Sequence, residues 1–244
     1  MAIYDRPVRL LMREMIDELA PTAGTVFTRR DALHWFTQQY PKVKDGTVAA
    51  HLLRFSTNSK SRHHYSPRPD EALLFQLDDG RFRRYDPATD PPPLSGQDPA
   101  DPGDLVDDDI AAEPSQFAYE SDLRDFLARN LMLIEPGLQL YEDEGITGVE
   151  FPVGGRFADI LGVDAQGRLV VIELKVSRGY DRVIGQLLRY MAWISEHQAE
   201  ASQGVRGMII AREISDDLRL ACSSVPDVEL FEYELAVTLR GVAV

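Results

Sequence analysis

The sequence predicts an α/β domain in the C-terminal half of the chain, preceded by a smaller α+β domain. Apolar residues at helical spacing dominate the beginning of the chain, whereas apolar runs of strand length alternate with helical patterns later on. Between them lies a stretch rich in Pro, Asp and Gly with few large apolar residues. We therefore predict an N-terminal domain over residues 1–86, an acidic linker over 87–117 and a C-terminal domain over 118–244.

Composition places the chain among ordinary globular proteins. The 244 residues are 44% hydrophobic and 27% charged, as expected of a protein that buries a core. No run approaches the roughly 18 apolar residues of a membrane span, and the N-terminus lacks a secretion-signal pattern. The single Cys222 excludes a disulfide framework and a cysteine-rich zinc site. We expect a cytoplasmic protein without a membrane partner.

The net charge of −14 is distributed unevenly along the chain. Residues 1–86 carry 14 basic and 11 acidic side chains, and residues 87–118 carry 8 acidic and no basic ones. The remaining residues hold 12 basic and 21 acidic side chains. The first segment can therefore face a polyanion such as a nucleic acid, whereas the second would repel one.

Three helices and a hairpin account for the N-terminal domain. Apolar spacing predicts a helix over residues 7–20, Thr28 predicts the capped start of a second helix, and a third fits residues 47–55. The segment ALLFQLDDGRFRRY predicts two short strands joined by a turn at residues 79–80. Three helices followed by a β-hairpin is the order of elements in a winged helix.

The segment after the third helix concentrates cations. In a winged helix the third helix commonly enters the major groove, and Lys or Arg side chains contact phosphate. The run of Asn58, Ser61, Arg62, His64 and Tyr65 also resembles a segment of winged-helix modules that precede nuclease domains in bacterial restriction-type proteins. We predict a DNA-binding set that consists of Arg54, Asn58, Lys60, Arg62, His64 and Arg68. The alternative is a solvated basic loop that binds nothing.

Two apolar strands around a tight turn form the centre of the C-terminal domain. If residues 165–167 form a three-residue loop with Gly167 in the left-handed conformation, Asp159 lies opposite Glu173. Lys175 follows Glu173 by two residues and projects from the same face of the strand. One face of the sheet then presents Asp159, Glu173 and Lys175 together.

These three charged groups lie among apolar residues, which is costly unless they pair or hold a metal ion. A structural ion pair of Glu173 with Lys175 is the alternative, but it leaves Asp159 without a partner. A divalent cation relieves the repulsion of two carboxylates, and hard oxygen ligands suit Mg²⁺ or Mn²⁺. A nearby lysine can orient or help deprotonate a bound water, so the pattern predicts phosphodiester hydrolysis.

The spacing from Asp159 through Glu173 to Lys175 resembles the signature of PD-(D/E)XK nucleases. The motifs ESDLRDFLARN, GGRFADILGVD, GRLVVIELKVSR and GQLLRYMAW resemble the C-terminal nuclease domain of the NucS/EndoMS family, over about residues 119–235. The resemblance implies a restriction-endonuclease-like mixed sheet flanked by helices. It implies that Asp159 and Glu173 bind the metal and that Lys175 is the catalytic lysine.

The same resemblance assigns three further residues. Glu120 matches an additional acidic residue in the first helix of the domain, and Gln186 matches a glutamine in the helix after the core strands. Both therefore belong to the catalytic set. Tyr190 lies one turn beyond Gln186 on the same helix face and is expected to contact DNA.

The N-terminal domain departs from that family, which carries a β-rich DNA-binding and dimerisation domain there. A winged helix ahead of this catalytic domain resembles a restriction or defence endonuclease. We expect an Mg²⁺- or Mn²⁺-dependent endonuclease that cuts double-stranded DNA as a homodimer, with the winged helix reading sequence or base modification. The alternatives are a NucS-type repair endonuclease for mismatched or branched DNA, and a DNA-binding regulator that does not cleave.

Overall fold

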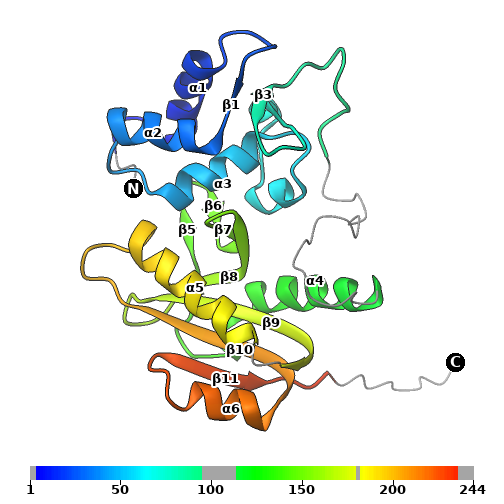
Figure 1. Cartoon of the computed structure of the whole chain (residues 1–244), viewed down its shortest axis with the longest axis vertical. Helices are drawn as coiled ribbons and strands as arrows, with labels where there is room; N and C mark the ends of the chain where they lie inside the picture. The colour runs from blue at the N-terminus through cyan, green and yellow to red at the C-terminus, as the bar shows by residue number, and fades with distance from the viewer. Residues whose placement is uncertain (1–3, 95–113, 180–181, 236–244) are drawn as a thin grey trace, which may run out of the picture.

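The computed structural model describes residues 4–94, 114–179 and 182–235. The N-terminal elements lie at one end of the long axis, and a six-stranded sheet with its helices lies at the other (Figure 1). Helix α3 of the N-terminal part faces β6 and β7 of the C-terminal part where the two meet. Within the described residues, no helix is long and apolar enough to span a membrane.

The N-terminal part contains the three helices and the hairpin in the predicted order. Its elements are α1 (Val8–Leu19), β1 (Val26–Phe27), α2 (Arg29–Gln39), α3 (Asp45–Phe55), the 3-10 helices η1 (Lys60–Tyr65) and η2 (Pro69–Glu71), β2 (Leu74–Gln76) and β3 (Phe82–Arg84). Thr28 caps α2 in a reciprocal pair with Asp31, as its position predicts. The short strand β1 joins the hairpin in the order β1-β3-β2. The sequence did not predict β1, because two residues carry no periodicity.

The C-terminal part is built on a mixed sheet with the strand order β11-β10-β9-β8-β4, with β7 paired to β8. Its elements are α4 (Pro114–Arg129), η4 (Leu131–Leu133), β4 (Gln139–Leu140), β5 (Glu142–Asp143), β6 (Ile146–Thr147), β7 (Val149–Val153), β8 (Arg156–Val163), β9 (Leu169–Gly179), α5 (Arg182–His197), β10 (Val205–Ile214), α6 (Asp216–Cys222) and β11 (Val228–Glu232). Strand β10 is parallel to both neighbours, and β8 is antiparallel to β9. The predicted α/β class is confirmed.

Helices α4 and α5 bury the two faces of this sheet. Val171 and Ile209 pack with Leu187 of α5, whereas their chain neighbours Ile172 and Ile210 lie in the cluster that includes α4. Successive side chains on a strand point to opposite faces, so a strand covered on both sides is apolar throughout. This explains the nearly continuous apolar run in β9. A charged residue within that run is therefore placed between the sheet and a helix.

The turn between β8 and β9 has the predicted geometry. Gly167 adopts a φ of 79°, in the left-handed region, and the N–H of Asp164 donates to the carbonyl of Arg168. The ladder then continues to the pair Ile160 and Ile172. The paired ladder ends there, and Asp159 and Glu173 are the next residues of the two strands, as the predicted register requires.

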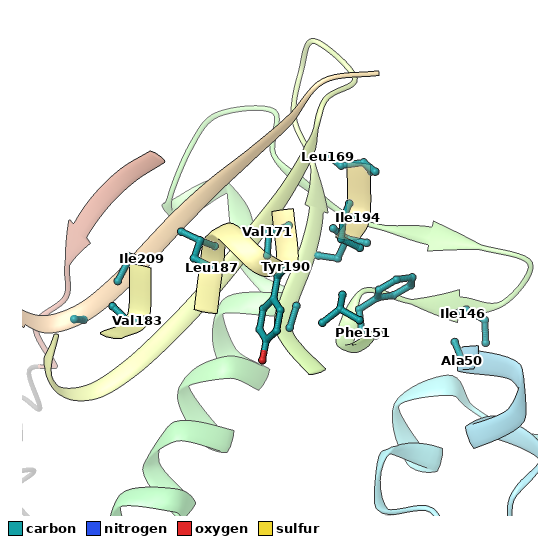
Figure 2. Close-up of a cluster of buried hydrophobic side chains, with 14 of the residues drawn as sticks. Ala50, Ile146, Phe151, Leu169, Val171, Val183, Leu187, Tyr190, Ile194 and Ile209 are labelled. Atoms are coloured by element: carbon teal, nitrogen blue, oxygen red, sulfur yellow. The ribbon is translucent and has the colours of Figure 1, made fainter. Parts of the chain in front are cut away.

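The N-terminal part packs directly on the C-terminal part. Ala50 on α3 and Tyr65 on η1 belong to the same hydrophobic cluster as Ile146 and Phe151. Figure 2 shows Ala50 beside Ile146 at one edge of this cluster, with Phe151 next to them. The two predicted domains therefore share part of one apolar core.

Only the ends of the predicted linker, residues 87–117, lie within the described part of the chain. At the front end, Asp90 forms an ion pair with Arg83, with Nη2 and Oδ1 2.5 Å apart. At the back end, α4 already begins at Pro114, so the extended segment was predicted too long. Residues 95–113 lie outside the described residues.

His51 on α3 is fully buried, and neither of its ring nitrogens has a hydrogen-bond partner among the described residues. Burial, together with the nearby charge of Arg54, lowers its pKa to about 3. The unfolded chain protonates this imidazole near pH 6.5, whereas the folded protein keeps it neutral. Acidification from pH 6.5 towards 3 therefore favours the unfolded state.

We expect His51 to cost the wild-type protein about 2 kcal/mol of unfolding free energy between pH 7 and pH 5. The variant His51→Leu lacks the titrating group, so its stability should fall less over the same interval. Denaturant unfolding of both proteins at the two pH values measures this difference. An equal loss in both would show that His51 is not the source of the acid sensitivity.

Candidate active site

Two strands and two helices bring five of the predicted site residues together. These are Asp159 on β8, Glu173 and Lys175 on β9, Glu120 on α4, and Gln186 on α5. The antiparallel register of β8 and β9 supplies the first three from neighbouring strands. The helices that cover the two faces of the sheet supply the other two.

Glu173 is the centre of the cluster. Its Oε1 accepts hydrogen bonds from Lys175 Nζ at 2.9 Å and from Gln186 Nε2 at 2.8 Å. Its Oε2 is buried and has no hydrogen-bond partner among the described residues. Lys175 Nζ also lies 3.8 Å from Glu120 Oε1. A buried carboxylate oxygen without a donor is costly, so this atom is the point at which a ligand would be gained.

Asp159 is held beside this cluster by the backbone of the neighbouring strand. The N–H of Leu174 donates to Asp159 Oδ2 at 2.7 Å. The pKa of Asp159 is raised by burial, against the opposing effects of Lys175 and this hydrogen bond. The aspartate is thus fixed in orientation at the point where its strand passes Glu173.

Burial and mutual repulsion dominate the electrostatics of the carboxyl groups. Burial, with the charge of Asp159, raises the pKa of Glu173 to about 8 and that of Glu120 to about 7. Burial also opposes the charge on Lys175, but the surrounding carboxylates outweigh it and raise the pKa of this ammonium. Lys175 therefore stays protonated at neutral pH. As a cation it pairs with Glu173 and lies near Glu120.

The residues fit a divalent oxygen-liganded cation. Asp159 and Glu173 offer hard oxygen ligands, and the buried Glu173 Oε2 is unsatisfied within the described chain. Among the described residues, no three His, Cys, Asp or Glu side chains already form a complete metal-binding group. Mg²⁺ and Mn²⁺ commonly bind through one or two carboxylates, with water and substrate phosphate as the other ligands. The cluster matches that pattern and not a closed structural metal site.

Tyr190 is too deeply buried to contact DNA. The side chain is 2% exposed and belongs to the apolar cluster beneath α5. Figure 2 shows its ring among the apolar residues, with the hydroxyl directed away from them, and this hydroxyl accepts a hydrogen bond from Gln186 Nε2 at 3.0 Å. Tyr190 therefore orients Gln186, and the prediction of a DNA contact is corrected.

The predicted DNA-binding set is largely internal. Arg54 is 6% exposed: its Nε donates to Glu71 at 2.9 Å and its Nη1 donates to the carbonyl of Gly145 at 2.7 Å. Arg62 is equally buried, and burial lowers its pKa. These two guanidinium groups face the interior, so their assignment to phosphate binding is corrected.

The other four members of that set divide between interior and surface. Asn58 exchanges hydrogen bonds with the backbone of Gln76, and the buried side chain of His64 faces Glu150. Lys60 and Arg68 are exposed. A DNA contact by Lys60 or Arg68 stays a prediction.

Sequence reasoning missed two charged residues beside the cluster. Arg124 lies one helical turn after Glu120 on α4, and it forms an ion pair with Glu150 on β7, with Nη1 and Oε1 2.5 Å apart. The spacing of four residues from Glu120 could have indicated Arg124. No local pattern marks Glu150, because its partners come from distant segments.

Carboxyl groups and a lysine on neighbouring strands of a mixed sheet, together with a glutamine from a covering helix, form the candidate site of the C-terminal α/β part. Residues 119–224 match the family model described as the Endonuclease NucS C-terminal domain. Residues 7–84 match the family described as a Domain of unknown function (DUF7669). The C-terminal part of this chain is thus similar to the C-terminal domain of Endonuclease NucS.

Relatives match over the same region. Endonuclease NucS from Methanopyrus kandleri is 33% identical over 105 residues, which are 43% of this chain and 37% of that protein. Endonuclease NucS from Sulfolobus acidocaldarius is 32% identical over 108 residues, which are 43% of this chain and 39% of that protein. The match thus spans less than half the length of these relatives.

Two solved structures are also similar. A repair endonuclease from Pyrococcus abyssi is 23% identical with a TM-score of 0.39, covering 52% of this chain and 49% of that one. The structure of an EndoMS–dsDNA complex is 23% identical with a TM-score of 0.40, covering 53% of this chain and 48% of that one.

Glu173→Gln should raise the melting temperature in EDTA at pH 8 by about 2–4 °C, because it removes the charge of one of three repelling carboxyl groups. Adding Mn²⁺ should then raise the melting temperature of the wild type but not that of the variant. Thermal unfolding measures both effects. The exposed Glu196→Gln on α5 is the control and should behave as wild type. A destabilised Glu173→Gln in EDTA would contradict the repulsion argument.

Proposed function

We propose that this protein is an Mg²⁺- or Mn²⁺-dependent DNA endonuclease of the NucS type. The observation that carries the proposal is the buried Glu173, whose Oε1 is held by Lys175 and Gln186 while its Oε2 has no partner among the described residues. Asp159 and Glu120 lie beside it. The match to the NucS C-terminal domain supports the same assignment.

Each residue of the cluster has a separate task. Asp159 and Glu173 would hold the cation, which when bound would supply a Lewis acid for the scissile phosphate. Gln186 fixes the Glu173 carboxylate, and Tyr190 in turn fixes the amide of Gln186. Lys175, which stays protonated, stabilises the negative charge that builds on phosphate oxygens during attack by water.

Among the alternatives, the repair type of endonuclease is better supported than the restriction type. The restriction interpretation was based on a winged helix that reads DNA ahead of the catalytic domain, and Arg54 and Arg62 of its predicted DNA-binding set are internal. The relatives with matching catalytic domains are NucS endonucleases. We therefore propose that the substrate is mismatched or branched DNA. We also propose that the protein acts as a homodimer, because one active site cuts one strand.

We expect Asp159→Ala and Glu173→Ala each to reduce DNA cleavage in Mn²⁺ by more than about a hundredfold, because each removes a metal ligand. Binding of DNA should be retained, since the metal site serves the chemistry. A nicking assay on plasmid and on duplexes with a mismatch or branch, with and without EDTA, measures cleavage, and a mobility-shift assay measures binding.

Asp217→Ala on α6, an exposed carboxylate outside the cluster, is the matched control and should cleave as wild type. The rival function is a DNA-binding regulator that does not cleave. Binding of DNA by the wild type without any metal-dependent cleavage would favour that rival and contradict the endonuclease.

A further inference from the structure

The N-terminal part reaches the active site through Glu150, a residue of β7 that no catalytic role accounts for. Ser61 Oγ donates to Glu150 Oε2 at 2.6 Å, and His64 Nε2 lies 3.6 Å from the same oxygen. Both residues belong to η1 of the N-terminal part. On the other side, Arg124 Nη1 of α4 donates to Glu150 Oε1 at 2.5 Å. The carboxylate of Glu150 thus joins η1 to α4.

The two C-terminal residues of this junction, Arg124 and Glu150, lie next to the candidate metal site. Arg124 lies one turn after Glu120 on α4, so its ion pair with Glu150 links that turn of the helix to β7. Glu150 lies between Val149 and Phe151, which pair with Ile160 and Ala158 of β8, and it is therefore opposite Asp159. A shift of Glu150 would therefore reach Asp159 on the neighbouring strand. It would reach Glu120 through Arg124.

The backbone of Glu150 also depends on the N-terminal part. Its φ of 46° lies in the left-handed region, which a residue other than glycine adopts only when its surroundings enforce it. Tyr65 at the end of η1 donates its hydroxyl to the carbonyl of Glu150 at 3.1 Å. Side-chain and main-chain contacts from η1 therefore hold this conformation together.

We propose that Glu150 and Arg124 are positioning residues through which η1 holds Asp159 and Glu120 in the arrangement that binds the metal ion. The N-terminal part then completes the active site and does more than deliver DNA to it. This inference rests on the proposed function for its activity readout. Its second readout, the affinity for Mn²⁺, does not depend on cleavage.

Two hydroxyl deletions across the same junction form a matched pair. Ser61→Ala removes the donor to Glu150, whereas Thr47→Val removes a donor to Asp143, which Thr47 Oγ1 contacts at 2.9 Å away from the cluster. Ser61→Ala breaks one hydrogen bond across the junction, whereas Thr47→Val breaks two, because Thr47 Oγ1 also accepts from Gln198 Nε2 at 3.3 Å. A loss of general junction stability would therefore affect Thr47→Val at least as strongly as Ser61→Ala.

We expect Ser61→Ala to weaken Mn²⁺ binding and to lower kcat about threefold to tenfold, with KM for DNA unchanged. Glu150→Gln, which removes the central charge at constant size, should lower both quantities about tenfold to a hundredfold. Thr47→Val should keep both within about twofold of wild type. Calorimetric titration of the full chain with MnCl₂ and steady-state cleavage kinetics provide the measurements.

Wild-type Mn²⁺ affinity in Ser61→Ala and Glu150→Gln would overturn the proposal, and so would an equal loss in Thr47→Val. If Ser61→Ala fails to fold, Glu150→Gln against Thr47→Val decides the matter. A wild-type protein that binds Mn²⁺ but cleaves no DNA would sink the endonuclease function alone, because the affinity series still tests the positioning roles. A wild type that does not bind Mn²⁺ would overturn both.

Discussion

Three carboxyl groups, those of Glu120, Asp159 and Glu173, crowd around the single ammonium of Lys175 in a partly buried space. In water such groups would separate and hydrate, so their proximity has to be imposed by the fold. The tight turn at Gly167 imposes the β8–β9 register, and two helices packed on opposite faces of the sheet bring the remaining groups. In the function proposed above, this crowding is what a divalent cation would relieve.

The apolar core holds these carboxyl groups close together. Alternation along β9 sends Val171 and Glu173 towards α5, and Ile172 and Leu174 towards the face that α4 covers. The apolar neighbours on both faces anchor the strand so firmly that Glu173 cannot turn outwards to water. Gln186, itself held by Tyr190, then satisfies one of its oxygens and leaves the other open. Packing therefore sets both the position of the carboxylate and its unsatisfied state.

Basic residues of the N-terminal part form contacts inside the protein that their local sequence does not predict. Arg54 looks like a phosphate contact from its helix and its neighbours, yet it pairs with Glu71 inside the protein and binds the carbonyl of Gly145. An arginine that bridges a carboxylate and a backbone carbonyl across a junction joins two parts of the chain. The N-terminal part is thereby attached beside the active site, with η1 against Glu150.

The sequence by itself determined the elements whose signals are local: the capped helix at Thr28, the turn at Gly167, and the register that sets Asp159 opposite Glu173. It also indicated the α/β class and most of the candidate site, because alternation along neighbouring strands and a short turn fix those positions. Only the tertiary structure decided that Arg54 is internal and that Glu150 links η1 to α4. Such contacts join residues roughly ninety positions apart, and no period or spacing in a single chain encodes which distant partner a charge will meet.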